Sequence, residues 1–171
     1  MSRGMIFGAG LALGLIIGFA FSVFAVPPEA EAVFSPEDGR EIIDFIDSAR
    51  ETLEIEVYTM SSRDVVDALG RARARGVDVR IILERNVLGG ENAEIYRELS
   101  AKGFAVRYAS KAFKLTHSKF IIVDGNEVLV GSHNLSNSAL FSNREASVIV
   151  RDAAIVGEFS EIFEGDWELA N

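Results

Sequence analysis

The stretch HSKFIIVDGNEVLVGSHN, residues 117–134, carries polar side chains at its two ends and apolar ones between them. Residues two apart on a β-strand face the same way, so His117 and Lys119 would project side by side at the start of an apolar strand. Gly131-Ser132-His133-Asn134 ends the next apolar strand. If the two strands pair through the turn Asp124-Gly125-Asn126, both polar ends meet at one edge of a sheet.

An imidazole, an ammonium, a hydroxyl and an amide that converge on a small volume suit a phosphate group. Lys119 and Asn134 would bind the phosphate oxygens, which leaves His117 free to attack phosphorus. Gly131 would let the backbone approach a ligand closely. The chain has two histidines and no cysteine, and few acids cluster near the histidines, so we expect neither a metal site nor another cofactor.

The pattern His-x-Lys-x4-Asp-x6-Gly-Ser resembles the signature of the phospholipase D superfamily, and Asn134 fits the Gly-Ser-x-Asn extension. The resemblance covers about Val33 to Trp167 and includes Asn143-Arg144-Glu145. With one copy of the motif, the chain is similar to the small bacterial endonucleases of the superfamily. It is also similar to the membrane-anchored mitochondrial cardiolipin hydrolase (Zucchini) group, although it lacks that group's cysteine-containing zinc insert.

The resemblance implies a role for each matching residue. His117 would be the nucleophile that forms a phosphohistidine, and Lys119 and Asn134 would hold the phosphate. Ser132 would assist at the phosphate or orient a neighbour, and Glu145 would accept a hydrogen bond from the histidine and fix its tautomer.

Two further residues of the stretch receive a structural interpretation. Asp124 belongs to the catalytic motif, but the strand separates it from His117, so we expect it to hold the turn. His133 is interpreted as a rim or packing residue.

The single motif predicts a homodimer with one shared site. Two-step phosphoryl transfer needs a nucleophile and an acid for the leaving group, and one imidazole cannot serve as both at once. A two-fold interface would supply a second His117. The resemblance implies the same arrangement, because the small single-motif members share a site between two chains.

The charge pattern leaves the substrate open. The net charge is −9, yet residues 99–123 contain no acid and five bases, of which Arg107, Lys111 and Lys114 are candidate substrate-binding residues. An endonuclease is the leading hypothesis, because phosphate contacts dominate nucleic-acid affinity. A phospholipase D-type lipid hydrolase is the alternative, supported by an N-terminal anchor that would hold the site near lipid head groups. A narrow basic groove would favour the nuclease and an apolar collar the lipid hydrolase. His117 together with Lys119 argues against a mere phosphate-binding module.

The N-terminus predicts a membrane anchor. Met5 to Val26 runs 22 residues without a charge, long enough to cross a bilayer of about 30 Å as a helix and longer than most cleaved signal cores. We assign residues 1–26 to this anchor (or a signal segment), 27–32 to a linker and 33–171 to the catalytic domain. Arg3 precedes the span, so the positive-inside rule places the domain outside the cytoplasm.

Helical and strand patterns alternate after the linker. A helix should start at Ser35-Pro36, and a C-terminal helix from Ala153 to Trp167 should bury five apolar residues: Ile155, Val156, Phe159, Ile162 and Phe163. The predicted strands are 53–59, 77–83, 104–108, 119–124, 127–131 and 146–150, with further helices at 62–75 and 91–102. This order predicts an α/β fold, a phospholipase D-like α-β-α sandwich around a mixed, largely buried sheet, plus an N-terminal transmembrane helix.

Overall fold

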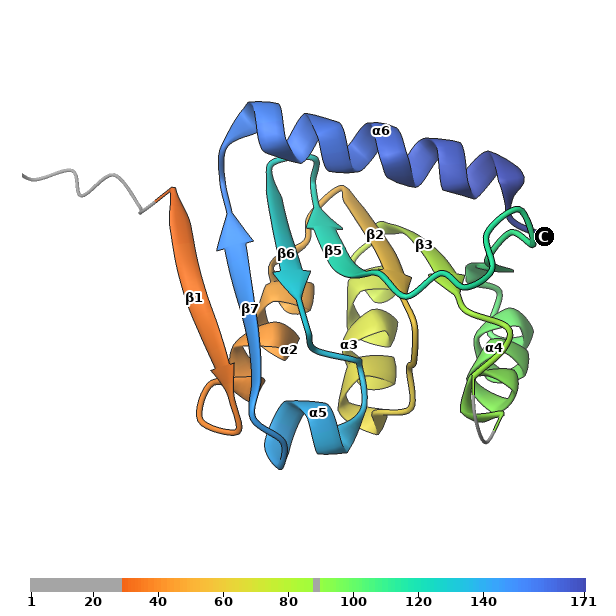
Figure 1. Cartoon of the computed structure of the whole chain (residues 1–171), viewed down its shortest axis with the longest axis horizontal. Coiled ribbons are helices and arrows are strands. Elements are labelled where there is room, and N and C mark those ends of the chain that lie inside the picture. Colours follow the sequence, from red (N-terminus) through yellow and green to blue (C-terminus); the bar gives the residue numbers. More distant parts are fainter. Residues whose placement is uncertain (1–28, 88–89) are drawn as a thin grey trace, which may run out of the picture.

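The computed structural model describes residues 29–87 and 90–171. Within them, seven strands form one mixed sheet in the order β1-β7-β6-β5-β2-β3-β4 (Figure 1). The strands are β1 (Ala30–Ser35), β2 (Thr52–Val57), β3 (Asp78–Leu83), β4 (Ala105–Tyr108), β5 (Lys119–Val123), β6 (Glu127–Gly131) and β7 (Glu145–Val150). The helices are α2 (Gly39–Ser48), α3 (Arg63–Ala74), α4 (Glu91–Ala101), α5 (Asn137–Phe141) and α6 (Ala153–Leu169).

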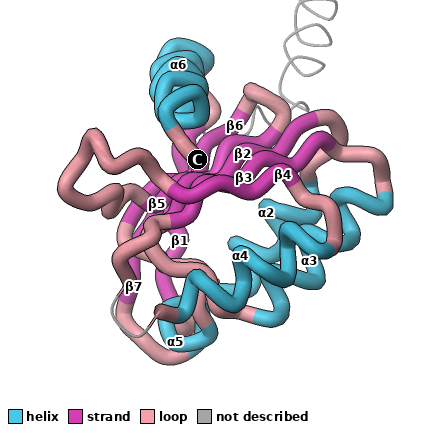
Figure 2. The backbone as a smooth tube through the Cα atoms, turned by 90° about the vertical axis from the view of Figure 1, so that its right-hand side faces the viewer, coloured by secondary structure: helices cyan, strands magenta, loops and turns pink. Residues whose placement is uncertain are grey.

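The helices cover both faces of the sheet. Helices α2 to α5 lie on one face, and α6 lies alone on the other (Figure 2). The larger apolar core fills the space between the sheet and α2 and α3. A smaller core under α6 contains Phe120, Ile122, Val156 and Phe163. The predicted α/β sandwich with a mixed sheet is therefore confirmed.

The predicted anchor, residues 1–26, lies outside the described residues. Among the residues that the structure does describe, no helix combines the length and apolar character that a membrane span requires.

The catalytic-motif strands pair as the sequence predicted. β5 and β6 are antiparallel, with Phe120 opposite Val130, and the turn Asp124-Gly125-Asn126 joins them. Asp124 adopts a positive φ of 53°, which its short polar side chain tolerates. Its carboxylate also accepts hydrogen bonds from the backbone N–H groups of Arg50 at 3.0 Å, Glu51 at 2.7 Å and Thr52 at 3.0 Å. Asp124 thus fixes the turn against the start of β2.

Strand β1 and the position at which helix α2 begins were not predicted. β1 pairs antiparallel with β7, with Ser35 opposite Glu145, so residues 30–32 belong to the sheet rather than to a linker. The prediction that Ser35 begins a helix is wrong, because Ser35 ends β1 and α2 begins at Gly39 after Asp38. A strand at this position is defined by its distant partner β7, which no local pattern reveals. The helix α5 was also missed, because its five residues are too few to show a helical repeat.

Helix α6 buries a narrower stripe than its sequence suggests. Val156 and Phe163 are buried, whereas Ile155 is 42% exposed and Ile162 is 60% exposed. Because α6 packs alone on its face of the sheet, no second helix covers its flank. The prediction that Ile155 and Ile162 are buried is therefore wrong, and both side chains belong to the surface.

We expect Asp124→Ala to lower the free energy of unfolding by about 2 kcal/mol, because three backbone N–H groups lose a charged acceptor. Burial favours the protonated form, but the three backbone hydrogen bonds prevail and lower the pKa of Asp124. The stabilisation is therefore complete above the ordinary pKa of aspartate and is lost as the pH falls through the lowered folded-state value. Urea unfolding from pH 7 to pH 3 measures both effects.

The exposed Asp78, at the start of β3, provides the matched control. Asp78→Ala should change stability by less than about 0.5 kcal/mol. Equal effects of the two substitutions, or a loss at Asp124 that persists unchanged at pH 3, would contradict the assignment.

Candidate active site

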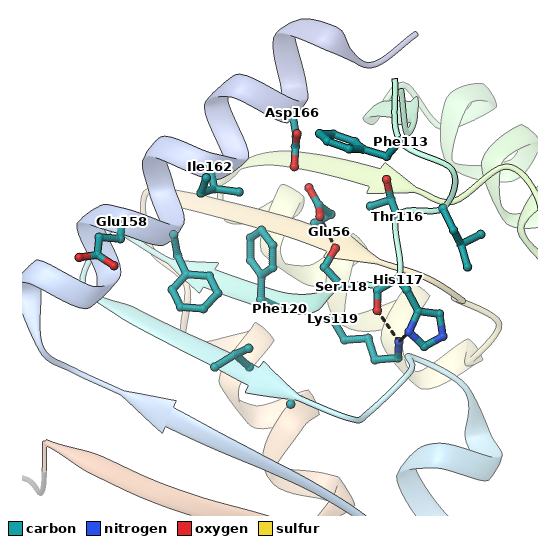
Figure 3. A pocket seen from close by; sticks show the side chains of 14 residues that line it. Glu56, Phe113, Thr116, His117, Ser118, Lys119, Phe120, Glu158, Ile162 and Asp166 are labelled. Atoms are coloured by element: carbon teal, nitrogen blue, oxygen red, sulfur yellow. Dashed lines mark hydrogen bonds between the residues drawn. The ribbon is translucent and has the colours of Figure 1, made fainter. Parts of the chain in front are cut away.

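A cleft of ≈590 Å³ opens between α6 and the strands β2, β5 and β6 (Figure 3). His117, Ser118 and Lys119 line it on the β5 side. Three exposed apolar side chains, Phe113, Leu115 and Ile162, line it elsewhere. His117, Lys119 and Gly131 of the motif therefore share one cavity with an apolar rim, whereas Ser132 and Asn134 do not line it.

His117 and Lys119 contact each other, as the alternation of the strand predicted. The Lys119 ammonium donates to the His117 carbonyl oxygen at 2.7 Å and lies 3.2 Å from His117 Nδ1. Lys119 is buried, and this burial lowers its pKa, although Glu145 opposes the shift. A buried ammonium with few partners is well prepared to bind an anion.

Tyr58 completes the surroundings of the histidine. Its ring lies 4.5 Å from the His117 ring, centroid to centroid, at an angle of 45°. The Lys119 ammonium lies 5.3 Å from the Tyr58 centroid, within the range of a cation–π contact. Tyr58 follows directly after β2 and thus supports both catalytic candidates from the neighbouring strand.

A buried polar network holds the segments around Tyr58 and His117. Asn92 donates to the carbonyl oxygens of Tyr58 at 2.7 Å and Glu84 at 2.9 Å, and accepts from the N–H of Met60 at 2.9 Å. The Glu84 carboxylate accepts from the N–H of Thr116 at 2.8 Å, one residue before His117. These residues therefore set the position of the nucleophile candidate.

Sequence reasoning missed Tyr58, Glu84 and Asn92. Tyr58 and Glu84 each follow the last residue of a buried parallel strand, β2 and β3 respectively. The ends of such strands are the usual place for a site in an open α/β sheet, so that position was the available signal.

Ser132 and Glu145 form the opposite side of the motif. The Ser132 hydroxyl donates to Glu145 Oε2 at 2.5 Å, and Asn143 donates to Glu145 Oε1 at 3.2 Å. The buried Ser35 hydroxyl donates to the carbonyl oxygen of Asn143 at 2.8 Å and so ties β1 to this segment. The expected hydrogen bond from His117 to Glu145 is not formed among the described residues, where Glu145 accepts from Ser132 and Asn143 instead.

His133 and Asn134 differ in their surroundings. His133 is buried, its Nδ1 lies 2.7 Å from the Ser147 hydroxyl, and burial lowers its pKa despite the Glu145 charge. Its interpretation as a packing residue is confirmed. Asn134 Oδ1 is buried without a hydrogen-bond partner among the described residues. A buried polar atom in that state is costly, so Asn134 has capacity left for a ligand.

The remaining candidates lie away from the cleft walls. Arg107 donates to the carbonyl oxygen of Trp167 at 2.7 Å and packs over its ring at 4.2 Å, so it is engaged within the chain, and its role in substrate binding stays a prediction. Lys111 and Lys114 are exposed on the loop that also carries Phe113 and do not line the cleft. Asp124 is at the far end of β5 from His117 and does not line the cleft either.

Residues 42–167 match the family described as "Cardiolipin synthase, PLD-like domain". The chain belongs to the phospholipase D superfamily. The structure therefore confirms the fold, and the match confirms the resemblance that the motif indicated.

The relatives that resemble the chain include a mitochondrial cardiolipin hydrolase and a phospholipase D. It is 30% identical over 135 residues to the mitochondrial cardiolipin hydrolase of Chlamydomonas reinhardtii, which covers 79% of this chain and 60% of the relative. It is 34% identical over 128 residues to a phospholipase D of Rickettsia bellii, covering 74% and 63% of the two chains. The chain thus spans less than two thirds of the length of these curated relatives.

Among solved structures, the phospholipase D family member Nuc from Salmonella typhimurium superposes with a TM-score of 0.77 at 27% identity. The match covers 83% of this chain and 95% of that one. The similarity extends over nearly the whole of a small superfamily member.

We expect Gly131→Ala to destabilise the protein by about 1–3 kcal/mol and to impair the site. A Cβ on Gly131 would lie 2.3 Å from the Ser147 hydroxyl and 2.4 Å from the Ala146 carbonyl oxygen, so the β6–β7 pairing must shift. Thermal unfolding together with activity measures the effect.

Gly70 is the matched control, since it lies in α3 and a Cβ there meets nothing within 4 Å. Gly70→Ala should leave stability unchanged or raise it by up to about 1 kcal/mol. If Gly131→Ala left stability and activity unchanged, the close pairing of β6 with β7 would not require glycine at this position.

Proposed function

We propose that the protein is a phosphodiesterase that acts on phospholipids. It would hydrolyse the phosphodiester bond to the head group through a covalent phosphohistidine at His117. The carrying observation is the apolar rim of the cleft that contains His117 and Lys119. Phe113 is 51% exposed, Leu115 is 42% exposed and Ile162 is 60% exposed. Large exposed apolar side chains beside a polar site suit the apolar part of a lipid.

This proposal reverses the order of the two hypotheses drawn from the sequence. Among the described residues that line the cleft, Lys119 is the sole lysine or arginine, whereas Glu56, Glu158 and Asp166 are acids. A cleft of that charge repels a chain of phosphates. An endonuclease stays the second candidate, because Lys111 and Lys114 are exposed on the loop that borders the cleft.

The reaction proceeds in two balanced steps. An imidazole nitrogen of His117 attacks phosphorus, the P–N bond forms, and the P–O bond to the leaving group breaks as that oxygen takes a proton from an acid. Water then attacks phosphorus and gives a proton to the same group, now a base, and the P–N bond breaks. Lys119 and Asn134 bind the phosphate oxygens in both steps, and no metal takes part.

The contact between Lys119 and His117 favours Nε2 as the attacking atom. The ammonium lies at Nδ1, and Nε2 has no partner among the described residues. When phosphate binds, Lys119 turns to its oxygens and Nδ1 becomes free to hold the ring proton. Nε2 then has the lone pair that attack requires.

A second copy of the chain supplies the acid. The chain has two histidines, and His133 is 3% exposed and contacts Ser147, which keeps it away from a leaving group. We therefore propose a homodimer in which the two His117 residues share one site, one as nucleophile and one as acid. Residues 1–26 would anchor this dimer in a membrane with its catalytic domain outside the cytoplasm.

We expect the purified full chain to hydrolyse cardiolipin or another phospholipid in mixed micelles faster than single-stranded DNA or RNA of equal phosphate concentration. Activity should persist in EDTA, because the proposed steps use no metal. His117→Ala should lower turnover by at least about 10³-fold. Nucleic acid cleaved faster than lipid would support the second candidate instead, and inhibition by EDTA would contradict the metal-free steps.

Mixing wild-type and His117→Ala chains tests the shared site. After random re-association in equal amounts, about one quarter of the dimers contain two wild-type chains, so activity per total chain should fall to about one quarter. If each chain had its own separate site, about one half of the activity per total chain would remain. Wild type re-associated with itself is the control, and full activity in a monomer shown by sedimentation would contradict the dimer.

A further inference from the structure

His133 is a buried histidine that the proposed chemistry does not use. The residue is 3% exposed, and its Nδ1 lies 2.7 Å from the Ser147 hydroxyl. Its Nε2 is buried without a hydrogen-bond partner among the described residues. An unpaired buried nitrogen is costly, whereas an apolar ring at the same position would carry no such cost. Packing alone therefore does not account for a histidine here.

A small cavity connects His133 with the phosphate-binding candidate. Its volume is ≈10 Å³, and His133 and Lys119 are the polar residues among the described ones that line it. The other lining residues are apolar: Val57, Phe120, Ile121, Leu129 and Leu135. One buried water needs about this much space and at least two polar partners. The imidazole and the ammonium supply two such partners.

The Lys119 ammonium has an N–H group to spare. Of its three N–H groups, one donates to the His117 carbonyl oxygen at 2.7 Å, and His117 Nδ1 lies 3.2 Å from the same nitrogen. The Tyr58 ring, 5.3 Å away at its centroid, attracts the charge but offers no oxygen or nitrogen acceptor. The described residues thus give the third N–H no such acceptor. An acceptor there would fix the direction of the other two.

We propose that His133 is a positioning residue for Lys119, whose ammonium donates to one buried water that in turn donates to His133 Nε2. The other two N–H groups are then held toward the His117 carbonyl oxygen and the phosphate. This order of hydrogen bonds fixes the tautomer, with the proton on Nδ1 donated to Ser147 and a lone pair on Nε2. Burial lowers the pKa of His133, although Glu145 opposes the shift, so the ring stays neutral beside the ammonium. The inference rests on the proposed binding of phosphate by Lys119.

Glutamine and asparagine at residue 133 separate the roles of the two ring nitrogens. A Gln amide reaches about as far as Nε2, and an Asn amide about as far as Nδ1. His133→Asn should lower kcat/KM by about tenfold for whichever substrate the wild-type chain hydrolyses best, whereas His133→Gln should rescue most of this loss.

Stability should follow the opposite order. The Asn variant keeps a partner for Ser147, so its Tm should be no lower than that of the Gln variant. A merely structural role would make activity follow Tm. Equal activities of the two variants, or activities that follow their Tm values, would overturn the inference.

The tautomer and the binding of an anion test the inference without turnover. In the His117→Ala chain His133 is the sole histidine, so ¹⁵N-labelled histidine reports on it alone. Long-range ¹H–¹⁵N spectra of the full chain in detergent micelles should show a proton on Nδ1 and none on Nε2. In the same background, His133→Asn should weaken the Kd for inorganic phosphate about tenfold, and His133→Gln should weaken it less.

A proton on Nε2, or a phosphate affinity that does not change in the Asn variant, would overturn the positioning role. If the spectra and the phosphate affinities agree with it but the wild-type chain hydrolyses neither lipid nor nucleic acid, the proposed function fails and the positioning role stands.

Discussion

The site depends on the antiparallel pairing of β5 with β6. Because Phe120 is opposite Val130, the residues just before β5 and just after β6 must lie at the same edge of the sheet. A shift of this register by one residue would turn Lys119 to the face that Phe120 now occupies, under α6. The carboxylate of Asp124 holds the opposite end of the same hairpin against the start of β2. A short turn, far from the cleft, thus sets the geometry at which the polar residues meet.

The electrostatics of the site follow from where burial occurs. Lys119 is buried beside His117, and Glu56 is buried beside Asp166, so each charged group lacks most of its water. Burial lowers the pKa of Lys119 and raises that of Glu56, which means that each would gain from a ligand of opposite charge.

The fold and the catalytic motif could be predicted from local patterns, whereas long-range partners could not. Alternation on β5 and the spacing to β6 placed His117, Lys119 and the Gly-Ser segment together. Glu145 was assigned to His117 by resemblance, but its oxygens accept hydrogen bonds from Ser132 and Asn143. Tyr58, Glu84 and Glu56 come from β2, β3 and their ends, and only the sheet order brings them to residues 116–118. Arg107 looked free in the sequence, and only the position of Trp167 shows that it is engaged.

The central claim is that His117 forms a covalent bond to phosphorus. Its most direct test is peptide mapping by mass spectrometry after the full chain and a phospholipid are mixed and quenched within one turnover. We predict an acid-labile adduct of the lipid phosphoryl group on the peptide that contains His117, absent from His117→Ala. Sustained hydrolysis with no adduct at residue 117, or with an adduct on a different residue, would contradict the account.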